Sequence, residues 1–245
     1  MPEDTQITSA ANSTSRRQFM GYAALFGGGM ALVSCSVTLP PKTAAEQQDI
    51  DILNYALTLE YLEAEFYSAF TGSGPYASKL TDPRVIEYAK EIAAHEISHV
   101  EALKKTIDSL GGKFVAKPTF DFSPLIGNAT VNDQLFLQLA ATLEPVGVRA
   151  YLGQVARLSK PALIAAAAAI HAVEANHVSA VQELRVKLGH NTAPTRQTDI
   201  APQSAAKPTS TAAADFDANY SPTPTAFWKA LTMAEVLAIV KPVIK

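Results

Sequence analysis

The sequence has little cysteine and no marked excess of charge of either sign. Its 245 residues include a single cysteine, Cys35, which excludes an intramolecular disulfide framework and any zinc cluster built from cysteines. Lysine and arginine number 20 against 23 acidic residues, so the net charge of −3 gives no general attraction to nucleic acid. Hydrophobic residues make up 48% of the chain, which excludes wholesale disorder. Any chemistry must therefore rest on residues other than cysteine, within a chain long enough to bury its own core.

The N-terminal part of the chain has the pattern of an export signal. Two arginines, Arg16 and Arg17, precede an uncharged apolar run at residues 19–33, which is shorter than the roughly 18–20 residues of a permanent membrane span. Paired arginines before such a run resemble a twin-arginine export signal. The run ends in the letters LVSC, which resemble a lipobox with Cys35 as the lipidated residue. We therefore expect residues 1–35 to direct export to the periplasm or cell envelope, with attachment to the membrane through the signal or a lipid anchor. The other interpretation is a short buried helix with an incidental cysteine.

The rest of the chain shows helical periodicity and no convincing run of strands. Asp82 before Pro83 is a typical helix start, and we expect Ser159 to begin a later helix in the same way, ahead of Pro161. Thr232 and Glu235 form a capping box for a short last helix that runs to about residue 240. The long helices are expected over residues 43–71, 83–110, 132–157 and 161–188.

The lengths of the connections predict how these helices are arranged. Short links join the first helix to the second and the third to the fourth, so each pair can form an antiparallel hairpin. Residues 113–130 are long enough to cross the length of a bundle. One long crossover is typical of ferritin-like four-helix bundles, so we expect an all-α fold of this kind over residues 43–190. Residues 191–245 should form an excursion rich in Pro, Thr and Ala that ends in the short helix.

The same pair of metal-binding residue types occurs once in each predicted hairpin. The second helix contains Glu96 and His99, and the fourth contains Glu174 and His177, both in the pattern Glu-x-x-His. Residues at i and i+3 lie on one helix face, so a carboxylate oxygen and an imidazole nitrogen can converge on one metal ion. A single match of this pattern can arise by chance, but two matches in corresponding helices favour a metal-binding site.

The first and third helices add a second correspondence. Glu60 is followed seven residues later by Tyr67, and Glu144 seven residues later by Tyr151, so each pair shares one stripe of its helix. The order Glu, Glu-x-x-His, Glu, Glu-x-x-His is therefore a weak internal repeat of two hairpins. Four carboxylates in an apolar bundle would repel one another strongly, and two divalent cations would remove that conflict.

Several other residues are candidates for the same metal site. Glu63 competes with Glu60, since helical phase excludes neither, although the tyrosine spacing favours Glu60. Pro145 directly follows Glu144 and could kink the third helix, which would either open a coordination position or spoil the site. The remaining candidates have no partner in the pattern and are expected to be packing or surface residues, namely His95, His171, His190, Glu65 and Glu101.

The pattern resembles the di-iron carboxylate proteins of the ferritin-like superfamily, in which two helices each supply a Glu and two supply Glu-x-x-His. More narrowly, the segments 53–67, 91–103 and 233–242 are similar to bacterial ferritin-like proteins grouped with plant desiccation-related proteins. The resemblance implies terminal ligands at Glu60 and Glu144, bridging ligands at Glu96 and Glu174, and one histidine, His99 or His177, on each metal. It places Tyr67 and Tyr151 beside the ligands, as hydrogen-bonding or oxidisable groups.

The resemblance also limits the chemistry without selecting one reaction. Two metal ions are implied, iron first, with manganese or zinc as alternatives. Partners would be these ions and O2 or peroxide, in Fe(II) oxidation or peroxide removal during stress, and a homo-oligomer is compatible with the family. Whether the protein is an enzyme stays open. The alternative is a desiccation- or stress-related envelope protein whose bundle is structural and whose metal site is vestigial.

Overall fold

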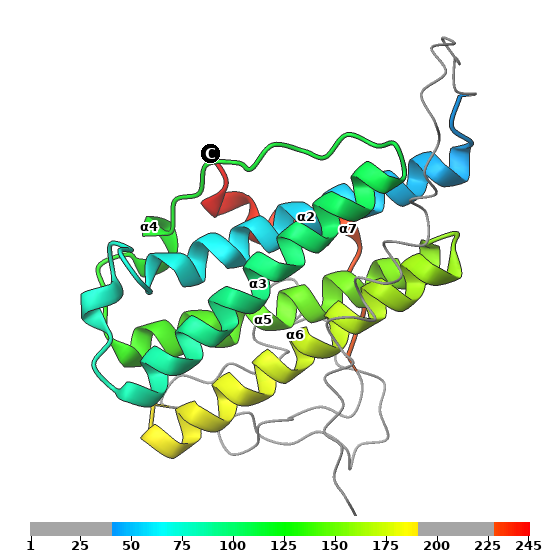
Figure 1. Cartoon of the computed structure of the whole chain (residues 1–245). Coiled ribbons are helices and arrows are strands. Elements are labelled where there is room, and N and C mark those ends of the chain that lie inside the picture. The colour runs from blue at the N-terminus through cyan, green and yellow to red at the C-terminus, as the bar shows by residue number, and fades with distance from the viewer. Residues whose placement is uncertain (1–40, 191–227) are drawn as a thin grey trace, which may run out of the picture. The chain divides into compact units, whose positions relative to one another are not determined.

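A computed structural model describes residues 41–190 and 228–245. The predicted export signal, Cys35 and the excursion after residue 190 lie outside these described residues. Within them, four long helices form the structure, and the only strand-like feature is an isolated bridge between Phe120 and Ile244. The prediction of an all-α fold is therefore confirmed. The long helices are α2 (Ala44–Ala69), α3 (Pro83–Ser109), α5 (Asp133–Gln154) and α6 (Pro161–Leu188) (Figure 1).

The helices form two hairpins, as their connections predict. In Figure 1, α3 folds back along α2, and α6 folds back along α5. The link between the hairpins includes a single helical turn, α4 (Ser123–Ile126), which the sequence did not predict. The short last helix, α7 (Met233–Val240), packs against α5 and is followed by the 3-10 turn η5 (Lys241–Val243). Two further 3-10 turns, η1 (Ala77–Lys79) and η2 (Val155–Arg157), follow α2 and α5.

Most helix starts are capped as the sequence predicts. Asp82 caps α3 by accepting a hydrogen bond from the amide of Arg84, and Thr232 and Glu235 form the capping box of α7. The prediction for Ser159 was wrong. The residue before α6 is Lys160, whose side chain makes no capping bond.

Ser159 has a different role, as a link between the hairpins. Its amide and hydroxyl donate to the two carboxylate oxygens of Asp49, at 2.7 Å and 2.5 Å. Asp49 lies on α2 and is fully buried. A buried carboxylate needs such donors, and this requirement outweighs the local preference of serine for the capping position.

The core consists of two apolar clusters with polar residues between them. One cluster includes Phe66 and Phe136, and the other includes Leu57 and Ile170. Along α3 and α6, the residues of one cluster give way to those of the other at the positions of the predicted ligands. The fold therefore holds its buried carboxylates at mid-height, closed above and below by apolar side chains.

Helix α6 is also long and apolar. Of the described helices, it is the one long and apolar enough to cross a membrane by length and composition. An alanine-rich core helix meets the same criterion, and α6 packs along α5 and contributes Glu174 and His177 to the interior. One such helix does not by itself indicate a membrane span, and 33% of its apolar stretch is buried among the described residues.

Candidate metal centre

All six predicted ligands lie together in the interior of the bundle, and each of the four long helices contributes. Two groups can be distinguished, within each of which one ligand atom per residue lies within 4.8 Å of all the others. Glu96 and Glu174 belong to both groups. The first group adds Glu60 and His99, and the second adds Glu144 and His177. Two overlapping groups that share two carboxylates have the arrangement needed to hold two neighbouring metal ions.

The two histidines present the same ring nitrogen to the carboxylates. Nδ1 of His99 lies 3.1 Å from Oε2 of both Glu60 and Glu96, and 3.4 Å from Oε1 of Glu174. Nδ1 of His177 lies 3.0 Å from Oε1 of Glu96 and 3.3 Å from Oε2 of Glu144. Each imidazole therefore faces one terminal carboxylate and at least one shared carboxylate.

The residues at the centre fit metal ions better than they fit one another. The carboxylates of Glu60, Glu96, Glu144 and Glu174 are fully buried, and among the described residues several of their oxygens have no hydrogen-bond partner. These oxygens are Oε1 of Glu96, Oε2 of Glu144 and both oxygens of Glu174, and Nδ1 of His177 is unpaired as well. Each such buried atom costs about 1–3 kcal/mol in a metal-free protein. A cation among these clustered atoms would satisfy them.

Two tyrosines hold the outer oxygens of the terminal carboxylates. The hydroxyl of Tyr67 donates to Oε1 of Glu144, and the hydroxyl of Tyr151 donates to Oε1 of Glu60. The predicted tyrosines thus lie beside the predicted ligands, but each bonds the glutamate of the opposite hairpin. This reciprocal pair leaves Oε2 of each glutamate directed toward a histidine. The tyrosines therefore orient the carboxylates and tie α2 to α5.

Burial and mutual repulsion dominate the electrostatics of the metal-free centre. Burial raises the pKa of Glu60 to about 7, against the effect of His99, and raises the pKa of Glu174 well above its usual range. For Glu96, burial would raise the pKa, but the neighbouring imidazoles of His177 and His99 outweigh it and lower the pKa to about 2. Burial lowers the pKa of His177, but the charge of Glu144 outweighs it, and the net result is a rise to about 11. The metal-free centre therefore retains protons that bound cations would displace.

Glu63 lies next to the centre without belonging to either group. It is 4% exposed, and burial followed by the charge of Glu174 raises its pKa well above the usual range. Space for it depends on Gly147 of α5. A Cβ at that position would lie 2.9 Å from Oε1 of Glu63 and 2.7 Å from Oε2 of Glu174. The structure thus places Glu60 in the cluster and Glu63 beside it, and the sequence pattern does not indicate that Gly147 makes room for these carboxylates.

His95 is half-buried, as expected of a packing or surface residue, and it also contacts the centre, with Nδ1 3.0 Å from Nε2 of His177. The two rings are nearly parallel, with centroids 5.3 Å apart. The signal was available in the sequence, because residues four apart share a helix face and His95 lies four positions before His99. The Glu-x-x-His pattern does not include His95, so the pattern alone does not indicate this contact.

The other residues weighed for the site lie away from it or leave it intact. Helix α5 continues through Pro145, and Glu144 remains in the cluster. Glu65 and Glu101 are partly exposed and pair with Lys117 and Lys104 at the surface, as expected of solvated residues.

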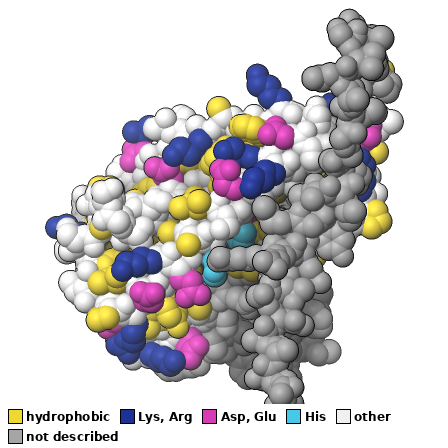
Figure 2. Space-filling view, in the orientation of Figure 1, with side chains coloured by type: hydrophobic (Ala, Val, Ile, Leu, Met, Phe, Trp, Pro, Cys, Tyr) yellow, Lys and Arg dark blue, Asp and Glu magenta, His cyan; other side chains and the backbone are white. Residues whose placement is uncertain are grey.

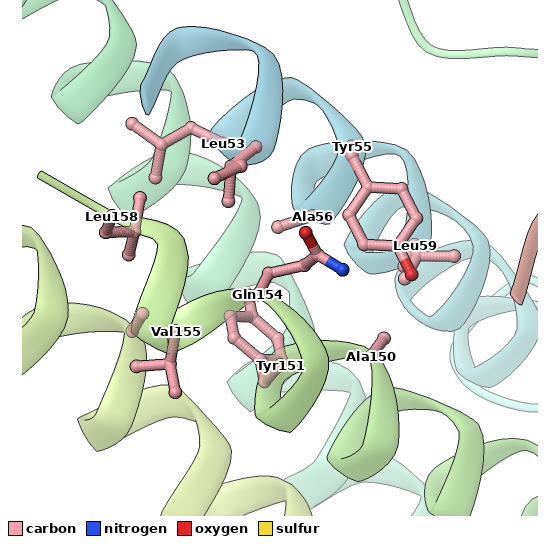
Figure 3. Close-up of a pocket in the computed structure, with 11 residues that line it drawn as sticks. Leu53, Tyr55, Ala56, Leu59, Ala150, Tyr151, Gln154, Val155 and Leu158 are labelled. Carbon is pink, nitrogen blue, oxygen red and sulfur yellow. The ribbon is translucent and has the colours of Figure 1, made fainter. Parts of the chain in front are cut away.

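An apolar pocket lies beside Tyr151, between α2 and α5. Figure 3 shows Tyr151, Gln154 and Tyr55 around it, together with apolar side chains such as Leu59 and Leu158. The pocket has room for a molecule of about the size of water, and its walls offer almost no polar surface. The Tyr55 hydroxyl is buried without a hydrogen-bond partner among the described residues. The surroundings on this side of the centre are therefore largely apolar, which strengthens electrostatic interactions within it.

Comparison with known proteins agrees with this geometry. The protein-family model described as a ferritin-like domain matches residues 48–187. This match covers more than half of the chain, extends from α2 to α6 and contains every residue of the cluster. No curated protein matches the chain.

Proposed function

Because the chain belongs to the ferritin-like family, we propose that it binds two metal ions and uses them in redox chemistry with dioxygen or peroxide. The observation that carries the proposal is the pair of overlapping ligand groups, which share Glu96 and Glu174. A structural bundle has no need of four fully buried carboxylates, several of which lack hydrogen-bond partners.

The ligands divide naturally between two ions. Glu60 and His99 would hold one ion, Glu144 and His177 the other, and Glu96 and Glu174 both. Two divalent cations bring four positive charges, which balance four ionised carboxylates when the histidines are neutral. Carboxylate and imidazole ligands suit iron and manganese, with zinc as a third candidate.

The protein's own residues would prepare the centre for reaction. When bound, a pair of iron or manganese ions supplies the oxidation and reduction steps of Fe(II) oxidation or peroxide removal. The hydroxyls of Tyr67 and Tyr151 orient the terminal carboxylates. The apolar clusters above and below exclude bulk water from these polar groups.

The proposed location of this function is the cell envelope. Support comes from the sequence alone, through the paired arginines and the LVSC segment that ends at Cys35. Twin-arginine transport carries folded proteins, so metals could be loaded before export. Replacing Arg16 and Arg17 by lysine should leave the folded protein inside the cell, and normal export of that variant would contradict the proposal.

Turnover by the metal-loaded protein tests the function. The full chain is loaded with Fe(II) or Mn(II), and oxygen-dependent Fe(II) oxidation and peroxide consumption are followed against Glu96→Ala. Glu101→Ala, an exposed residue of the same helix, is the matched control. We expect one of the two activities in the wild type and the control, and its loss in Glu96→Ala. Bound metal without either activity would show a non-catalytic protein of the desiccation- or stress-related kind.

A further inference from the structure

His95 is a half-buried histidine that the proposed metal-binding groups do not include. It lies on α3, one residue before Glu96, yet it contacts a residue of α6. Nδ1 of its ring lies 3.0 Å from Nε2 of His177. Figure 2 shows histidine atoms at the molecular surface on the face formed by α3 and α6. Because His95 is half-buried and His177 is buried, their contact lies between the centre and the molecular surface.

The geometry determines which of the two nitrogens in this contact carries the proton when a metal ion is bound. Nδ1 of His177 faces Glu96 and Glu144, so this nitrogen must offer its lone pair to a cation at the centre. A neutral imidazole carries its proton on the other nitrogen, here Nε2. That N–H can donate only to an acceptor, and Nδ1 of His95 is placed to accept it. The opposite arrangement, with His95 donating, would put the proton of His177 among the carboxylates.

The second histidine of the centre has no such support. Nδ1 of His99 faces the carboxylates in the same way, but the described residues supply no hydrogen-bond partner for its Nε2. The two halves of the centre are alike in their ligands and differ in this outer contact. Any effect of His95 should therefore fall on one metal ion of the two.

We propose that His95 is a positioning residue that accepts a hydrogen bond from Nε2–H of His177 and thereby keeps Nδ1 of His177 available to a metal ion. The inference rests on the proposed function, since it concerns a ligand of the same centre. Outer hydrogen bonds of this kind orient metal-binding histidines, and their loss lowers metal affinity by about 10–100-fold. His95 thus makes the two metal positions unequal, and the position at His177 depends on it.

Two substitutions separate this role from simple packing. His95→Leu keeps a side chain of similar size and removes the acceptor. His95→Asn keeps an acceptor oxygen at nearly the position of Nδ1, because Oδ1 of asparagine branches from the same carbon. His190→Leu, beyond the end of α6, is the matched control for replacing a histidine.

The experiment titrates the metal-free full-length proteins with Mn(II) and with Co(II), whose visible absorption reports its ligands. Affinities are measured by competition with a chelating dye. We expect two ions in the wild type and in His190→Leu. His95→Leu should bind one ion normally and the other about 10–100-fold more weakly, with a changed Co(II) spectrum for that ion. His95→Asn should restore most of the affinity.

Three outcomes would overturn the inference in different ways. If His95→Leu binds both ions as the wild type does, His95 has no positioning role and the proposed function stands. If both ions are weakened equally and His95→Asn gives no rescue, the role is structural. If the wild type itself binds no metal, the proposed function fails first and the inference fails with it.

Discussion

A methyl group added at Gly147 should reveal how closely the centre depends on its packing. The Cβ of Gly147→Ala would lie 2.7 Å from Oε2 of Glu174 and 2.9 Å from Oε1 of Glu63. An ordinary contact is at least 3.4 Å, so the two oxygens must retreat by about 0.7 Å and 0.5 Å. Metal–ligand distances in proteins tolerate deviations of only about 0.2 Å. Because Glu174 belongs to both ligand groups, both metal ions should be affected.

The expected effects of Gly147→Ala on folding and on binding are different in size. Alanine is favoured over glycine within a helix by about 0.5–1 kcal/mol, and overpacking a core costs about 1–3 kcal/mol. The free energy of unfolding of the metal-free protein should therefore fall by no more than about 2.5 kcal/mol. Metal affinity should fall at least about tenfold, which corresponds to about 1.4 kcal/mol.

Gly153 of the same helix supplies the matched control. A Cβ there would lie 1.9 Å from the backbone oxygen of Leu231, and its nearest atoms include no metal ligand. Gly153→Ala should lower stability by displacing that segment and leave metal affinity unchanged. Urea unfolding of the metal-free proteins and dye competition for Mn(II) measure the two quantities. Unchanged binding of both ions by Gly147→Ala would refute the reasoning.

Three further predictions concern hydrogen bonds and protons. Tyr151→Phe leaves Oε1 of Glu60 buried without its donor and should lower the stability of the metal-free protein by about 1–3 kcal/mol; an unchanged urea midpoint would contradict it. Asp49→Ala removes the acceptor of both Ser159 donors and should cost a similar amount without changing metal affinity, as the same two assays would show. In the metal-free protein the pKa of Glu60 is raised to about 7 and that of His177 to about 11, so the folded state binds more protons than the unfolded state. Its stability should therefore fall as the pH rises from about 5 to about 8, while its metal affinity rises. Unfolding curves at several pH values, with and without Mn(II), measure both quantities, and a stability that rises with pH in the metal-free protein would contradict the prediction.

The sequence predicts the helices well because their ends carry local signals. Asp82 with Pro83 and Thr232 with Glu235 act within one turn, so their effect does not depend on the rest of the fold. Ser159 shows the limit of such signals. Its bonds go to Asp49, more than a hundred positions away, and a distant buried carboxylate cannot be seen from the local pattern.

Only those features of the candidate centre that follow from residue spacing within one helix could be predicted from the sequence. The spacing of Glu96 with His99 and of Glu174 with His177 follows from the helix itself. Contacts between hairpins do not, so the crossing of each tyrosine to the opposite glutamate could not be derived.

The same limit applies to His95 and Gly147, whose contacts no local sequence pattern indicates. His95 contacts a residue of α6, and Gly147 of α5 makes room for a carboxylate of α2 and another of α6. Both depend on which helices face each other and at what height. That information lies in the packing of the bundle and in no local pattern of residues.

The central claim is that the buried cluster holds two metal ions. The most direct test is the metal content of the folded full-length protein, measured by elemental analysis after loading with Fe(II) or Mn(II). The variant His99→Ala with His177→Ala removes one ligand from each ligand group and is measured in parallel. We predict about two ions per chain in the wild type and their loss in the double variant. A wild type without metal, or a double variant with the same metal content as the wild type, would contradict the account.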